Sequence, residues 1–201
     1  MDFLGSSPFN PQLSMPAGES ILSPFSVLSP AQDVVSLAFG TMHFMLIDRI
    51  TEIRPGASIT AIKALSLAEE YLQDHFPRFP VMPGVLMLEA MLQAGTFLVH
   101  RTEDFQHSTV VLRKARNLKF AGFVRPGETL TVRVEIIENE GNQTTVKGEG
   151  WIGETLAVSG RLVLERYNAG DRQPHLRPWD AHARAQLRQR FEQLYRPQSE
   201  N

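Results

Sequence analysis

The sequence predicts an α+β domain in which one long apolar helix packs against about six antiparallel strands. Two observations carry this prediction. The mostly apolar run VLMLEAMLQAGTFLV, at 85–99, has the length and composition of a buried helix. The chain after residue 107 then alternates between apolar and polar side chains, in segments separated by Gly-containing turns, as half-buried strands do. A sheet wrapped around a central helix satisfies both patterns, because both faces of the helix then find apolar neighbours.

Size and composition indicate one ordinary globular domain. The chain has 201 residues, of which 42% are hydrophobic and 21% charged. A formal net charge of −2 gives no reason to expect a nucleic-acid partner, and the absence of Cys excludes disulfides, Cys-bound zinc and thiol chemistry. The first basic residue is Arg49, so a secretory or transit peptide is not expected. The run 85–99 is too short to span a bilayer, so we expect a cytoplasmic protein without membrane insertion.

The chain before the apolar helix predicts an extension followed by two strands. Residues 1–28 are rich in Ser and Pro, a composition typical of extended or disordered chain. The stretch SPAQDVVSLAF that follows predicts a short helix with Ser29 as its N-cap. Strands are then predicted at 43–53 and 55–65, and a single helical turn at 67–72.

The chain from Gly84 onward predicts the central helix, four strands and a final helix. The helix should run from Gly84 to about His100, and the strands should lie at 108–122, 128–139, 143–152 and 154–166. Beyond Tyr167 a loop leads to a helical pattern with Asp180 as a possible N-cap. One face of this helix is apolar and carries Ala183, Leu187, Phe191 and Leu194. This pattern favours packing on its own subunit or a neighbour, with a partner-specific docking helix as the alternative.

The predicted organisation is therefore an N-terminal extension at 1–35, one folded domain at 36–166 and a C-terminal extension at 167–201, the last containing an amphipathic helix.

The segment DHFPRFPVMPG, at 74–84, carries the first candidate site residues. Its prolines, Pro77, Pro80 and Pro83, restrict the backbone and bias the residues before them towards extended conformations. We therefore expect a stiff strap that aims His75 at a fixed point. Gly84 follows at the start of the helix, where free N–H groups and the positive end of the helix dipole face outward. Without a side chain, Gly84 lets a ligand oxygen approach closely.

The central helix carries the second set of candidates. Glu89 lies among apolar residues, so desolvation should raise its pKa, and Gln93 lies one turn further on, where it can hold the carboxyl group. A base at His75, an acid at Glu89 and an N–H donor at Gly84 suit proton abstraction next to a carbonyl. From the residues alone, other readings stay open: a packed structural histidine, a polyproline docking motif, or a glutamate that only forms an ion pair.

The stretch DHFPRFPVMPGVLMLEAMLQAG resembles the signature of the β-hydroxyacyl-acyl-carrier-protein dehydratases of the FabZ type. FMLIDRI and LKFAGFVRPGETL resemble two further segments of that family, so the similarity covers about 36–166. The resemblance implies a hot-dog fold, in which a curved antiparallel sheet wraps a long helix. It also implies an obligate homodimer, commonly assembled into a hexamer as a trimer of dimers. Each active site would lie between subunits, with His75 of one facing Glu89 of the other.

The resemblance also implies residue roles, carried over by matching position. His75 would remove the C2 proton of a (3R)-hydroxyacyl thioester, and Glu89 would protonate the departing C3 hydroxyl, leaving a trans-2-enoyl product. The Gly84 N–H would polarise the thioester carbonyl, the Val81 carbonyl would hold the His75 ring, and Gln93 would orient Glu89. The implied enzyme is a hydro-lyase of fatty acid or related lipid biosynthesis. It needs no metal or other cofactor, and its substrate arrives on the phosphopantetheine arm of acyl carrier protein.

The sequence departs from the family pattern in places. Asp74 and Arg78 stand where the family usually has glycines. KFAGFV is nearer to the sister family that also isomerises the double bond, but that sister has Asp where this chain has Glu89. We therefore expect dehydration without isomerisation. Two other functions remain as alternatives: a hot-dog thioesterase with Glu89 as its base, and a catalytically inactive paralogue that binds acyl carrier protein.

Basic residues suggest where a carrier protein would dock, because carrier proteins are strongly acidic. The candidates are Arg78, Arg113, Lys114, Arg116, Lys119 and Arg125. Regular strand alternation would place Arg113 and Lys119 on one face of the strand. Lys114 and Arg116 would then lie on the other face, so one flat partner could not contact all four unless the strand bends. The alternative is a solvated strand face with no partner.

Overall fold

The computed structural model describes residues 44–195, so the Ser/Pro-rich segment and the helix predicted at 29–39 lie outside the described residues. The strands are β1 (Arg49–Arg54), β2 (Ser58–Ala64), β3 (Thr109–Phe120), β4 (Thr129–Glu140), β5 (Gln143–Ile152) and β6 (Thr155–Tyr167). The helices are η2 (Glu70–Leu72), α2 (Gly84–Thr102), α3 (Ala169–Arg172), η3 (Pro174–Leu176) and α4 (Arg177–Leu194). The predicted α+β class, with one long helix and six strands, is confirmed.

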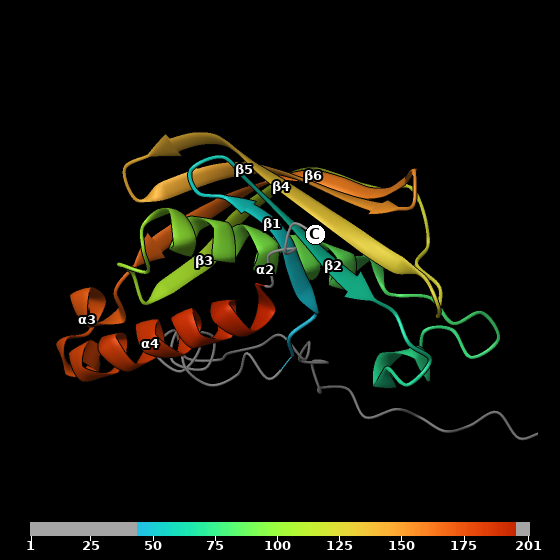
Figure 1. The fold of residues 1–201 in the computed structure, drawn as a ribbon, viewed down its shortest axis with the longest axis horizontal. Helices are drawn as coiled ribbons and strands as arrows, with labels where there is room; N and C mark the ends of the chain where they lie inside the picture. Colours follow the sequence, from blue (N-terminus) through green and yellow to red (C-terminus); the bar gives the residue numbers. More distant parts are fainter. Residues whose placement is uncertain (1–43, 196–201) are drawn as a thin grey trace, which may run out of the picture.

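The six strands form a single antiparallel sheet in the order β1-β2-β4-β5-β6-β3. The sheet curves over α2, and α4 runs along the opposite side of that helix (Figure 1). β3 therefore lies at one edge of the sheet, next to β6, although β4 and β5 separate the two strands in the sequence.

The core lies between α2 and the concave face of the sheet. Met91, Ala94 and Leu98 of the helix are fully buried against it, together with apolar residues of β1, β2, β4, β5 and β6. Gly148 on β5 permits this close approach, because a Cβ there would lie 2.9 Å from the Met91 sulfur. At about 25 cal/mol per Å² of apolar surface removed from water, this packing is the main source of stability.

The first strand begins later than the sequence predicted. We expected a strand over 43–53, but β1 starts at Arg49. Leu46 and Ile47 are almost fully buried, and a side chain of α2 binds their backbone N–H groups, as described below. The apolar run that suggested a strand is thus a segment packed against the helix.

The C-terminal region is more helical than predicted. The expected loop contains α3 and η3, and α4 begins at Arg177, with Pro178 in its first turn. Asp180 is not the N-cap of α4, because it lies inside the helix and is buried. Its two carboxylate oxygens accept the N–H groups of Ala169 and Gly170, at 2.9 and 3.0 Å. Asp180 therefore caps the start of α3, since those first N–H groups have no acceptor within their own helix.

The apolar face of α4 packs on its own subunit, which is one of the arrangements that the sequence predicted. Phe191 is buried, and its ring lies 6.2 Å from that of Phe97 on α2 and 5.8 Å from that of Phe105. At the end of the helix, Tyr195 forms a parallel bridge with Ile50 of β1. Within residues 44–195, no helix is both long and apolar enough to cross a membrane.

Candidate active site

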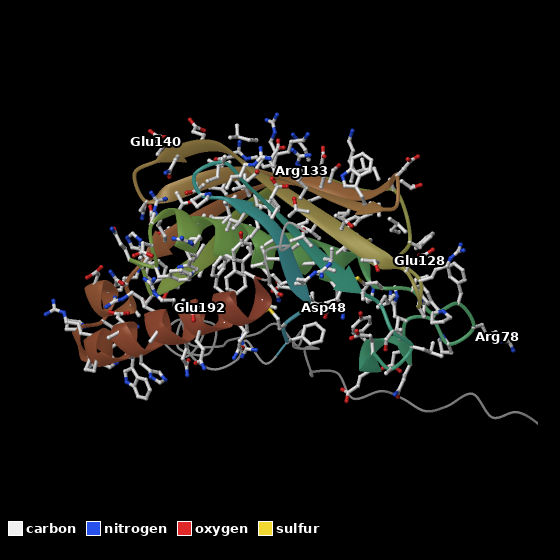
Figure 2. All side chains as sticks on the ribbon, viewed as in Figure 1. Asp48, Arg78, Glu128, Arg133, Glu140 and Glu192 are labelled. Carbon is white, nitrogen blue, oxygen red and sulfur yellow. The ribbon has the colours of Figure 1, made fainter. Side chains whose placement is uncertain are left out.

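The proline-containing segment is a closed loop and not the extended strap that we predicted. Pro77 and Arg78 occupy a turn in which the Phe79 N–H donates to the Phe76 carbonyl oxygen at 2.9 Å. Proline favours this turn position, because its fixed φ matches the backbone required there. The Val81 N–H then donates to the carbonyl of His75 at 3.2 Å and closes the loop. Arg78 lies at its tip and points away from the body of the protein (Figure 2).

The loop holds the His75 ring in one orientation. Nδ1 lies 3.0 Å from the carbonyl oxygen of Val81, the contact that the family resemblance implied. Because a carbonyl oxygen can only accept, Nδ1 must carry the hydrogen of this bond. In the neutral ring, the other nitrogen, Nε2, then presents a lone pair. The ring of Phe76 lies 4.3 Å away, centroid to centroid. This geometry leaves His75 able to accept a proton at Nε2.

The loop is fixed to the protein at its C-terminal end. Val81 and Met82 are almost completely buried. The Met82 N–H donates to the carbonyl oxygen of Val124 at 2.9 Å. Val124 belongs to the connection between β3 and β4, so this connection and the histidine loop are held together next to the start of α2.

Gly84 is the first residue of α2, and its N–H has no acceptor within the helix. The ring of Phe120, the last residue of β3, lies directly against it: a Cβ on Gly84 would be only 3.0 Å from Phe120 Cδ1. Sequence reasoning missed Phe120, because nothing in the local pattern indicates that the end of β3 meets the start of α2. A side chain at this position would therefore force the Phe120 ring to shift.

Gln93 fixes the position of Glu89. Its Nε2 donates to Glu89 Oε1 and to the Phe44 carbonyl oxygen, both at 3.0 Å. Its Oε1 accepts the N–H groups of Leu46 and Ile47, at 2.9 and 3.4 Å. Both hydrogens of the amide and both lone pairs of its oxygen are thus engaged, so the group cannot turn. The predicted contact between Gln93 and Glu89 is present, and its anchor in residues 44–47 was not foreseen.

The surroundings favour the protonated form of Glu89. Burial raises the pKa of this carboxyl group, and the hydrogen bond from Gln93 lowers it by a smaller amount. The carboxyl group therefore holds its proton to higher pH than an exposed glutamate, as a general acid requires. The sequence predicted the direction of this shift from the apolar neighbours of Glu89.

The candidate residues form two groups around the N-terminal half of α2. One group is His75 with Val81, and the other is Glu89 with Gln93, while Gly84 begins the helix between them in sequence. Within the described chain, no hydrogen bond or ion pair joins His75 to Glu89. Among residues 44–195, no group of three or more His, Asp or Glu side chains is arranged to hold a metal ion.

Exposed apolar side chains surround the start of α2. Phe76, Phe79, Val85, Phe120 and Phe123 are between 44% and 65% exposed. The rings of Phe79 and Phe123 meet edge to face with centroids 5.9 Å apart, and the Arg125 guanidinium lies 5.3 Å from the Phe79 ring centroid. Clusters of exposed apolar residues of this kind mark surfaces that bind a ligand or another chain. The sequence placed Val85 in the predicted helix and Phe120 in a predicted strand, and it did not indicate that these five residues form one exposed surface.

The basic candidates are not arranged as strand alternation predicted. Arg113 forms an ion pair with the buried Glu165, at 2.7 Å, so it has a structural partner. Lys114, Arg116 and Lys119 face Val163, Arg161 and Ser159 of β6, which all lie on its outer face. The expectation that Lys119 would point away from Lys114 and Arg116 is therefore wrong. The reason is an irregularity in β3 between Arg116 and Lys119.

Comparison with known proteins places the fold and the family. The FabA-like domain matches residues 40–161. The 3-hydroxyacyl-acyl-carrier-protein dehydratase FabZ of Levilactobacillus brevis is 39% identical over 139 residues, which are 69% of this chain and 93% of that protein. The protein of the same name from Oceanobacillus iheyensis is 41% identical over 121 residues, 60% of this chain and 86% of that one.

The solved structures include the dehydratase heterocomplex ApeI:P of Xenorhabdus doucetiae. It aligns with a TM-score of 0.51 at 18% identity, over 62% of this chain and 84% of that one, and supports the hot-dog fold. The helix α4 lies beyond the residues that the FabA-like domain matches. The chain therefore belongs to the FabA-like family of hot-dog proteins, among the FabZ-type dehydratases.

Proposed function

We propose that this protein dehydrates a (3R)-hydroxyacyl thioester carried on acyl carrier protein to the trans-2-enoyl thioester, in fatty acid or related lipid biosynthesis. The observation that carries the proposal is the pair of fixed side chains near the start of α2, His75 and Glu89, in a chain of this family. In its neutral form the His75 ring presents a lone pair at Nε2, and burial raises the pKa of the Glu89 carboxyl group. A base and an acid in these states can remove water from a 3-hydroxyacyl group without a further cofactor.

The proposed steps follow from the geometry. The N–H of Gly84, at the positive end of the helix, polarises the thioester carbonyl and makes the C2 proton more acidic. Nε2 of His75 takes that proton, and Nδ1 keeps its hydrogen bond to Val81, which stabilises the ring as it becomes charged. Glu89 gives its proton to the C3 hydroxyl, which leaves as water. The atoms balance: one C–H and one C–O bond break, and a C2–C3 double bond forms.

The proposed product is the 2-enoyl thioester without isomerisation. Glu89 is held by Gln93, which is itself held by three backbone groups of residues 44–47. A carboxyl group fixed in this way can reach one position on the substrate, the C3 oxygen. Moving the double bond would require a second proton transfer at C4.

We also place each active site between two subunits of a homodimer, or of a multiple of one such as a trimer of dimers. Within the described chain no hydrogen bond or ion pair joins His75 to Glu89, and the start of α2 is surrounded by exposed phenylalanines. A second copy that covers this apolar surface would bring its own acid to the first copy's base.

The test is an assay of the purified protein with a carrier-bound 3-hydroxyacyl substrate, followed by enoyl thioester absorbance. His75→Ala and Glu89→Gln should each lower the rate by about 10²–10⁴-fold, the usual contribution of one general acid or base. Both variants should keep the wild-type oligomeric state in gel filtration. Wild-type rates in either variant would refute the assigned role. Release of free thiol by the wild type would instead indicate thioester hydrolysis.

A further inference from the structure

A buried lysine lies at the end of β2, on the face of the sheet that packs against α2. The residues Ile59, Ala61 and Lys63 alternate along this strand as its buried positions. Lys63 is 6% exposed and is the only buried lysine among residues 44–195. Its Nζ lies 2.6 Å from Glu69 Oε1 and 3.7 Å from Asp48 Oδ1. We call Lys63, Glu69 and Asp48 the ion cluster.

Glu69 connects the ion cluster to the segment that leads to His75. It is the N-cap residue of η2, and its carbonyl oxygen accepts the Leu72 N–H at 3.1 Å. Leu72 is buried, so this short helix is fixed to the core. His75 follows three residues after Leu72 and begins the loop that holds its ring. The position of Glu69 therefore determines where the histidine loop starts.

Asp48 connects the ion cluster to the segment that holds Gln93. Its Oδ2 accepts the Ala64 N–H at 2.6 Å, next to Lys63 itself. Asp48 directly follows residues 44–47, whose backbone binds the amide group of Gln93. The ion cluster thus fixes one end of the segment that holds this amide and, through it, the proposed acid.

Tyr71 joins the same two segments a second time. It belongs to η2, and its ring meets that of Phe44 edge to face with centroids 6.2 Å apart. Burial and the nearby carboxylates of Glu69 and Asp48 raise the pKa of its hydroxyl. That hydroxyl is buried without a hydrogen-bond partner among residues 44–195. Since an unpaired buried hydroxyl costs stability, this junction is not arranged for stability alone.

Stability does not explain why a lysine is buried here. Charged groups lose hydration when they are buried, and apolar residues of similar volume often stabilise a fold as well as a buried ion pair does. A buried pair does constrain geometry, because moving one partner leaves the other charge unpaired away from water. Lys63 constrains two segments in this way, one that leads to His75 and one that holds Glu89 through Gln93.

We propose that Lys63 is a positioning residue, which sets the placement of His75 and Glu89 by holding Glu69 and Asp48. This inference rests on the proposed function, because it assigns Lys63 to the proposed base and acid of the reaction. Lys63 itself does not touch the substrate. Each chain places its own base and its own acid through one cluster, so the effect does not depend on whether a site lies within a subunit or between two.

The double variant Lys63→Met/Glu69→Met tests the proposal, because stability and position should respond differently. Two apolar side chains replace the buried pair, so the melting temperature should stay at or above the wild-type value. Asp48 is 44% exposed, so it remains hydrated and keeps its bond to the Ala64 N–H. We expect kcat and kcat/KM for dehydration to fall by the same factor, roughly ten- to hundredfold, as for misplaced reacting groups.

A second, milder variant is Glu69→Gln. Its amide oxygen can still accept the hydrogen bond from Lys63 Nζ, but the charge of the partner is lost. This weaker bond should lower kcat by roughly three- to tenfold at an unchanged melting temperature. If the double variant does not fold, this variant decides the question.

Amide hydrogen exchange, followed by mass spectrometry, measures position without activity. The N–H groups of Leu46 and Ile47 donate to Gln93, and the Val81 N–H closes the histidine loop. All three should exchange roughly tenfold faster in the double variant, because both segments open more easily. The amides that pair β5 with β6 should exchange as in the wild type.

The matched control is Lys147→Met/Glu149→Met. These residues of β5 form an ion pair with the same 2.6 Å distance, but on the outer face of the sheet, where their side chains are 49% and 24% exposed. The substitutions are identical to those in the test variant. Both kcat and the exchange of the three amides should therefore stay at the wild-type values.

The outcomes separate this inference from the proposed function. Wild-type kcat in a folded Lys63 or Glu69 variant would overturn the inference, and so would a lower kcat with unchanged exchange at the three amides. A lower melting temperature with faster exchange throughout the sheet would also overturn it, since Lys63 would then only support the core. Failure of the wild type to dehydrate a carrier-bound or pantetheine thioester would overturn the proposed function, whereas the exchange experiment would still show whether Lys63 holds the two segments.

Discussion

At the scale of single residues, Gln93 connects two parts of the protein that are distant in the sequence, the helix α2 and residues 44–47. Its amide group joins Glu89, one turn earlier on α2, to the backbone of residues 44–47. Each of these hydrogen bonds contributes roughly 1 kcal/mol, and leaving a buried partner unpaired costs more. The position of the acid therefore depends on a segment outside the helix. The sequence could predict the contact to Glu89 from the helical spacing, but not the backbone contacts, since these need the tertiary fold.

The pKa of Glu89 leads to a prediction about stability and pH. Burial raises this pKa in the folded protein, so the folded state holds the proton more tightly than the unfolded state. The stability that this proton binding contributes is complete below the ordinary pKa of glutamate, and it is lost as pH rises through the raised, folded-state pKa. In Glu89→Gln this pH-dependent loss of stability should not occur, because the new side chain does not ionise. The variant still has a side-chain oxygen that can accept the hydrogen bond from Gln93. We expect the variant to melt with the wild type near pH 4 and at a higher temperature than the wild type at pH 7.5.

Calorimetry of both proteins from pH 4 to 8 would check this. The matched control is Glu140→Gln, because Glu140 is exposed beside the β4–β5 turn (Figure 2) and forms no ion pair with any of residues 44–195. The difference in melting temperature between Glu140→Gln and the wild type should not grow with pH. A Glu89→Gln difference that is constant from pH 4 to 8 would contradict a raised pKa.

At the scale of elements, periodicity predicted the regular parts and missed the irregular ones. The helix α2 and strands β4 to β6 lie within two residues of their predicted bounds, because long alternating or apolar runs leave few alternatives. In β3 the prediction of which side chains point outward was wrong, because it did not include the bulge, which depends on pairing with the neighbouring strand. The loop of residues 76–79 likewise depends on hydrogen bonds that proline spacing does not indicate.

The helix α4 is an element whose contribution to stability can be measured. Phe191 anchors it between Phe97 and Phe105 and is 6% exposed. Phe191→Ala should lower the free energy of unfolding by about 3 kcal/mol, the low end for a buried phenylalanine. Urea denaturation measures the change. Gln189→Ala, at an exposed position of the same helix, should change it by less than about 0.5 kcal/mol. Equal effects of the two substitutions would mean that α4 is not anchored on the core.

At the scale of the whole molecule, the two ends of α2 differ. At its C-terminal end, Glu103 forms an ion pair with the buried Arg166, which also donates to Thr144 at 2.9 Å and to the Gly141 carbonyl at 2.7 Å. That end is closed by polar contacts and by α4. The N-terminal end carries exposed phenylalanines and the N–H of Gly84. The molecule is therefore sealed at one end of its central helix and open at the other, where the candidate site lies.

This asymmetry supports a prediction about the assembled protein. In each described chain, no hydrogen bond or ion pair joins His75, the proposed base, to Glu89, the proposed acid. If a second copy covers the open end of α2, each site takes its base from one subunit and its acid from the other. A mixed dimer of His75→Ala and Glu89→Gln chains then has one site with both substitutions and one with neither. Random exchange makes half of the dimers mixed, so the mixture should recover about a quarter of wild-type activity per site, far above either variant alone, whose losses are about 10²–10⁴-fold.

The measurement mixes the two purified variants under conditions that exchange subunits, and follows exchange by native mass spectrometry with one variant isotopically labelled. The control mixes each variant with itself under the same conditions, which should recover nothing. Mixed dimers that form without any gain in activity would show that both groups of one site come from a single chain.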